Sequence, residues 1–179
     1  MNWKENYASE LKKWLDVAAE LEMLGSLANF SYNNPTYANP EINNDYKVSF
    51  ETMGHPLISS IKRVDNSVDF SENPFVVLTG SNMSGKSTFL RSVAVNLVLA
   101  SSGSVVCAKK ASIHILPLYV SMRLSDSLAD SESYFYAEIK RLHDIMIHLE
   151  NERAFVLLDE ILRGTNSDDK RNGTDVLSG

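Results

Sequence analysis

The sequence contains a single cysteine, Cys107, so no disulfide can form within the chain. Its longest apolar run, Val93 to Ala100, is interrupted by Asn96 and is far too short to cross a bilayer. The N-terminus also lacks the basic region and apolar segment of a secretory signal. We therefore expect a cytoplasmic protein, with no membrane contact evident in these residues.

An excess of positive charge is also missing. The chain has 17 Lys and Arg against 23 Asp and Glu, a net charge of −6. The net charge of the chain therefore does not attract it to phosphate backbones. Any DNA-binding surface is expected elsewhere in a longer protein. Zinc-ligand spacing is absent as well. With 179 residues, 44% of them hydrophobic, the chain is long enough for a domain with a sizeable core.

The first part of the chain predicts a helix followed by a linker. Apolar residues recur there at spacings of three, four or seven. Pro35 and Pro40 push the residues before them out of the helical region, so the helix must end earlier. We predict a helical segment and linker over 1–45 and a second domain over 46–179. The apolar stripe favours packing against the rest of the protein over a free partner-binding helix. Its members are Trp3, Tyr7, Leu11, Trp14, Ala18, Leu21 and Ala28.

Short apolar runs then alternate with helical periodicities. Runs without polar alternation are typical of a parallel sheet that is covered on both faces. The sequence therefore predicts an α/β fold with a predominantly parallel sheet flanked by helices. Strands are expected over Tyr46–Phe50, Phe75–Leu78, Val105–Cys107, Ala111–Ile115, Leu118–Val120 and Phe155–Leu158, and helices over Ser87–Leu99 and Tyr134–Leu149.

A glycine-rich loop lies between one expected strand and the following helix. Residues 80–87 match G-x-x-x-x-G-K-[ST], the Walker A pattern of a P-loop. Glycines at its ends let the backbone wrap an anion, while Lys86 can reach the β- and γ-phosphates and Ser87 can ligate Mg²⁺. A chance match is the alternative, but the flanking strand and helix favour function. The expected nucleotide-binding residues are Gly80, Ser81, Asn82, Met83, Ser84, Gly85, Lys86, Ser87 and Thr88.

Two acids follow the last expected strand. A buried strand over 155–158 delivers Asp159 to the edge of the sheet where open α/β folds bind ligands. Asp159 is predicted to hold Mg²⁺ together with Ser87, and Glu160 to activate the attacking water. The alternative is that the two acids only keep the end of the strand in contact with solvent. Combined with the loop, this Walker B-like pair predicts ATP hydrolysis on a P-loop NTPase fold of the ABC-like kind.

Several stretches resemble the MutS family of DNA mismatch-repair ATPases. Residues 79–91, TGSNMSGKSTFLR, resemble the family pattern TG-x-N-x-x-GKST-x-x-R, and 159–165, DEILRGT, resemble DE-x-x-RGT. Residues 133–138 resemble S-T-F-x-x-E with Tyr134 in place of Thr, and 54–56 resemble a GRHP-like turn. Residues 1–45 resemble the tail of the family's helical core. The resemblance covers nearly the whole chain.

The resemblance implies a homodimer that couples ATP turnover to clamp movement on DNA. In that arrangement Ser133 of one subunit would touch the γ-phosphate bound by the other, so Lys86, Glu160 and Ser133 in trans are the expected catalytic residues. From the sequence alone, Ser133 and Glu138 could instead simply cap their helix. The family's catalytic histidine would lie beyond Gly179, so this chain by itself is expected to hydrolyse ATP weakly or not at all.

The sequence differs from the family pattern where family members bind the adenine base of ATP. Family members often carry a base-stacking aromatic residue where this chain reads Arg63-Val64-Asp65-Asn66. Two alternatives follow: Arg63 stacks on the base through its guanidinium, or the base is held by other residues. Other readings remain open: another ABC-type ATPase, which the missing LSGGQ-like sequence argues against, a MutS paralogue with a different DNA role, or a nucleotide-binding switch without significant hydrolysis.

Overall fold

The computed structural model describes residues 3–73, 75–81, 83–122 and 131–159. The chain forms two compact units. The first comprises Met1–Val76 and Val95–His114, and the second comprises Val77–Ala94 and Ile115–Gly179. The predicted division places a domain boundary after residue 45, whereas these two units are each built from two separate stretches of the chain. The predicted domain boundary stays a prediction.

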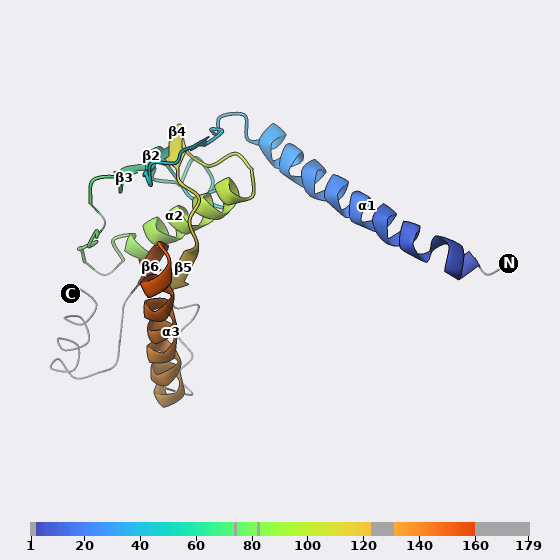
Figure 1. The fold of residues 1–179 in the computed structure, drawn as a ribbon. Coiled ribbons are helices and arrows are strands. Elements are labelled where there is room, and N and C mark those ends of the chain that lie inside the picture. Colours follow the sequence, from blue (N-terminus) through green and yellow to red (C-terminus); the bar gives the residue numbers. More distant parts are fainter. Residues whose placement is uncertain (1–2, 74, 82, 123–130, 160–179) are drawn as a thin grey trace. The chain divides into compact units, whose positions relative to one another are not determined.

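The first unit begins with α1 (Trp3–Asn33), drawn in blue in Figure 1. The helix ends two residues before Pro35, as predicted, and the Asn34 side-chain amide donates to the Phe30 carbonyl at 2.8 Å. Most of the apolar side chains of α1 whose burial is described are exposed, including Trp14 and Leu21. The surface that we expected to cover this stripe is therefore not found among the described residues.

A four-stranded sheet follows, with the order β1-β4-β2-β3. Its strands are β1 (Glu41–Ile42), β2 (Val48–Met53), β3 (Asn66–Asp69) and β4 (Lys110–Ile113). β1 pairs with β4 in parallel, whereas β2 is antiparallel to both β3 and β4. The buried residues of β2 are Val48, Phe50 and Met53. These side chains build one face of the first core.

Helix α2 (Lys86–Ser101) supplies the rest of that core through its C-terminal half. Leu97 and Ala100 are buried. The helix ends at Ser101, and Gly103 in the following turn has a φ of 76°, the left-handed angle that favours glycine after a helix. The stretch Val105–Cys107, predicted as a strand, is buried but makes only an isolated bridge from Val106 to Ala38.

In the second unit, β5 (Leu118–Ser121) and β6 (Phe155–Leu158) form a parallel pair. The chain between them includes α3 (Ser131–Asn151), as a parallel connection requires. Both strands and both helices α2 and α3 lie where the sequence predicted them, to within a few residues.

The predicted fold is nevertheless wrong. The described strands do not form a predominantly parallel sheet of the P-loop NTPase type. The four-stranded sheet is mixed, and the parallel pair β5–β6 is a separate two-stranded sheet. Residues 75–78, expected as a strand before the loop, are not a strand and are exposed, with Phe75 at 70%. The antiparallel position of β2 agrees with its alternating burial, which is typical of a sheet with one solvated face.

Candidate functional site

The glycine-rich loop has the backbone that its sequence predicts. Gly80 and Gly85 have φ angles of 155° and 90°, which side chains rarely allow. Met83 also lies in the left-handed region, at 65°, with a fully exposed side chain. A Cβ atom on Gly80 would lie 2.9 Å from Ser84 Oγ, so this hydroxyl would have to shift to admit an alanine.

Lys86, the first residue of α2, folds back over this loop. Its Nζ donates to the carbonyls of Gly80 and Ser81 at 2.8 and 2.7 Å. Ser84 Oγ lies 3.5 Å from the same nitrogen. These bonds hold a positive charge across the mouth of the loop, next to the N-terminus of a helix whose first turn has no acidic residue. A helix N-terminus beside a lysine favours an anion, because the dipole of the helix end adds to the lysine charge.

The other predicted loop residues flank this lysine. Ser81, Ser84 and Thr88 are exposed and Ser87 is half-buried. The Thr88 carbonyl accepts a hydrogen bond from Ser92 Oγ at 2.8 Å, inside α2. Asn82 lies outside the described residues.

Asp159 follows β6, as predicted. Its backbone amide donates to the Ser121 carbonyl at 2.9 Å, which extends the β5–β6 ladder by one residue, and Asp159 is half-buried. Glu160 lies outside the described residues. Among the residues that the structure does describe, no cluster of three or more His, Cys, Asp or Glu could hold a metal. A magnesium site at Ser87 and Asp159 thus stays a prediction.

Ser133 lies in the first turn of α3, which begins at Ser131. Its side chain is not among those described. Glu138, in the second turn, is half-buried and takes part in an interaction. The role of Ser133 in a partner's site therefore stays a prediction.

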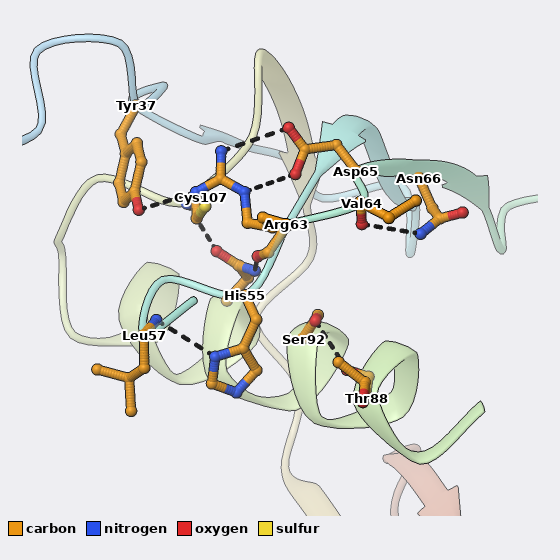
Figure 2. Close-up of polar contacts among 12 residues, drawn as sticks. Tyr37, His55, Leu57, Arg63, Val64, Asp65, Asn66, Thr88, Ser92 and Cys107 are labelled. Atoms are coloured by element: carbon orange, nitrogen blue, oxygen red, sulfur yellow. Dashed lines mark hydrogen bonds and ion pairs between the residues drawn. The ribbon is translucent and has the colours of Figure 1, made fainter. Parts of the chain in front are cut away.

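In the first unit, Arg63 is held by its neighbours (Figure 2). Its guanidinium makes two bonds to the Asp65 carboxylate, at 2.6 and 3.3 Å, and donates to Tyr37 Oη at 3.4 Å. The hydrogen bond that Arg63 donates to Asp65 is the main reason that the pKa of Arg63 is raised. Burial, and then a hydrogen bond with Cys107, raises the pKa of Tyr37 to about 12. The guanidinium is thus already engaged, which does not favour Arg63 as a base-stacking group.

Asn96 joins three segments of this unit, and sequence reasoning missed it. The side chain is completely buried. Its Nδ2 donates to the Gly54 carbonyl at 3.0 Å, and its Oδ1 accepts from the Cys107 amide at 2.7 Å. The only signal in the sequence was a polar residue within an apolar helical run. In the adjacent turn, His55 Nδ1 accepts from the Leu57 amide at 3.3 Å, which supports a structural role (Figure 2).

Gly54→Ala tests how tightly the turn is packed. A Cβ atom at this position would collide with the side chains of Arg63 and Asp65. We expect the free energy of unfolding to fall by about 1–3 kcal/mol, the usual effect of overpacking. Urea denaturation measures it. Gly25→Ala is the matched control, because a Cβ there meets nothing within 4 Å. Equal stability of Gly54→Ala and the unmodified chain would show that the ion pair moves aside freely.

Comparisons with known proteins cover both the loop and Asp159. The family model described as MutS domain V matches residues 76–173. "DNA mismatch repair protein MutS" from Clostridium perfringens is 33% identical over 94% of this chain and 19% of its own length. The proteins of the same description from Methanosarcina mazei and Haloquadratum walsbyi are 33% and 34% identical, each over 91% of this chain. The chain spans about a fifth of the length of these relatives. In the described residues, no helix is long and apolar enough to cross a membrane.

Proposed function

Because this chain belongs to the MutS family, we propose that it is the ATP-binding part of a MutS-like protein that couples ATP hydrolysis to clamp movement on DNA. One observation carries the proposal: two loop carbonyls hold the Lys86 ammonium beside a helix N-terminus without acidic residues. That is a place where phosphates bind. The relatives, described as DNA mismatch repair proteins, support the DNA role.

In this proposal each residue has one task. The loop amides and Lys86 bind the β- and γ-phosphates of ATP. Ser87 and Asp159 carry the hydroxyl and carboxylate oxygens that Mg²⁺ prefers and would hold it; bound Mg²⁺ would offset phosphate charge. Glu160 takes the proton of the attacking water. Ser133 contacts the γ-phosphate bound by a second subunit.

In this proposal a longer protein contributes the helical core and the DNA-binding regions. We propose that residues 1–45 join a helical core to the nucleotide-binding domain over 46–179. DNA is bound through regions outside this chain, because the chain itself has a net charge of −6. The working form is a cytoplasmic homodimer, and this chain alone hydrolyses ATP weakly or not at all.

Lys86→Ala provides the direct test of nucleotide binding. It removes a cation that makes charge-assisted hydrogen bonds, each about 1.5–3 kcal/mol. We therefore expect the affinity for Mg·ATP to fall by about one to two orders of magnitude, as measured by calorimetric titration. Lys12→Ala, on the exposed surface of α1, is the control and should bind ATP unchanged. Equal affinities of Lys86→Ala and the unmodified chain would remove Lys86 from the site.

A further inference from the structure

Met83, in the glycine-rich loop, is a bulky residue at a backbone angle that favours glycine. Its φ is 65°, and the Ser84 amide donates to the Ser81 carbonyl at 3.3 Å, so the chain turns sharply here. Glycine adopts such an angle without strain, whereas a side chain at this angle costs free energy. Backbone strain of this kind is concentrated at functional positions, which directs attention to what the Met83 side chain does.

The Met83 thioether is the most accessible among the methionines that the structure describes. Its side chain is fully exposed to solvent. The others are Met23 and Met146, exposed by 54% and 38%, the half-buried Met122, and Met53, exposed by 1%. The thiol of Cys107 is buried. Oxidation of methionine to its sulfoxide requires that the oxidant reach the sulfur, so Met83 is the sulfur that a peroxide attacks first.

A sulfoxide at this position adds a strong hydrogen-bond acceptor three residues before Lys86. The loop is short and closed, because its own carbonyls hold the Lys86 ammonium. A thioether is a weak acceptor, whereas the sulfoxide oxygen is polar. The exposed side chain has three rotatable bonds, so this oxygen can turn back to the mouth of the loop. There it accepts hydrogen bonds from the donors that a phosphate group would use.

We propose that Met83 is an oxidation switch for nucleotide binding, an inference that rests on the proposed function. A peroxide transfers one oxygen atom to the Met83 sulfur: the O–O bond of hydrogen peroxide breaks, an S–O bond forms, the sulfur loses two electrons and water leaves. The sulfoxide oxygen then competes with the phosphates of ATP for Lys86. Methionine sulfoxide reductase reverses the change, because two thiols give up two electrons, form a disulfide and release the oxygen as water.

Brief treatment of the chain with hydrogen peroxide, followed by peptide mass spectrometry and calorimetric titration with Mg·ATP, tests the switch. We expect Met83 to be oxidised before Met23 and Met146, while Met53 stays unmodified. The affinity for Mg·ATP should fall at least about threefold, since hydrogen bonds to a charged group are among the stronger ones. Treatment with methionine sulfoxide reductases for both sulfoxide epimers should restore the affinity without any mutation.

Two variants assign the effect to one sulfur. Met83→Leu removes the reactive atom, so peroxide should leave the affinity of this variant at whatever value it has before treatment. Met23→Leu is the matched control, because Met23 is also exposed but lies on α1. It should lose affinity on oxidation as the unmodified chain does. Circular dichroism checks that peroxide leaves each protein folded.

The switch is wrong if Met23 or Met146 is oxidised before Met83, or if complete conversion of Met83 to the sulfoxide leaves Mg·ATP affinity unchanged. An equal loss of affinity in peroxide-treated Met83→Leu would also overturn it. If the untreated chain did not bind Mg·ATP at all, the proposed function would fall together with the switch. Binding that survives oxidation overturns the switch alone, so the two failures are distinguishable.

Discussion

Glu160→Gln, made in the longer protein that contains this chain, is expected to keep Mg·ATP bound while hydrolysis slows by about 10²–10⁴-fold. Glutamine has almost the shape of glutamate but cannot accept a proton from water. The proposed binding groups, Lys86 and the loop amides, are untouched. The loss should therefore appear in the chemical step and leave affinity intact.

Single-turnover hydrolysis and retention of labelled nucleotide, measured on the same samples, separate these two quantities. Glu150→Gln is a suitable control, since Glu150 is an exposed carboxylate near the end of α3. It should hydrolyse ATP at the normal rate. A Glu160→Gln protein that loses nucleotide but keeps its rate per bound ATP would show that Glu160 is structural.

Asn96→Ala is expected to lower the free energy of unfolding by about 3–5 kcal/mol, a large share of the roughly 5–15 kcal/mol that stabilises an ordinary domain. The Asn96 side chain has no exposed surface. Its loss leaves the Gly54 carbonyl and the Cys107 amide without that hydrogen bond in a place that water does not reach. Each such buried group costs about 1–3 kcal/mol, and the cavity adds to this.

Thermal and urea unfolding, followed by circular dichroism, give the size of the effect. Asn151→Ala is the control, because Asn151 also bonds to a backbone carbonyl but is exposed on α3. It should change stability little. Asn96→Leu fills the space without restoring the hydrogen bonds and should remain strongly destabilised. If Asn96→Leu were as stable as the unmodified chain, filling the space would be what matters and the hydrogen bonds would contribute little.

Local patterns located most of the helices and strands, yet they misjudged the sheet. The helical spacing before Leu149 and the apolar run from Phe155 to Leu158 led to α3 and β6, because short-range sequence decides these elements. The run from Phe75 to Leu78 has the same apolar character and is not a strand. A run of four apolar residues can enter a sheet only where a partner strand is available, and sequence periodicity does not say where that partner is.

The sequence by itself determined the local form of the glycine-rich loop. Gly80, Gly85 and Lys86 lie within seven residues of one another, so the bonds from Lys86 to the loop carbonyls form within a single short segment. Only the tertiary structure decided the rest: the antiparallel place of β2, the bond from Asn96 to Gly54 across 42 residues and the reach of Arg63 to Tyr37 across 26. Such partners meet only when the core closes, since the free energy that joins them comes from burial and from bonds between distant segments.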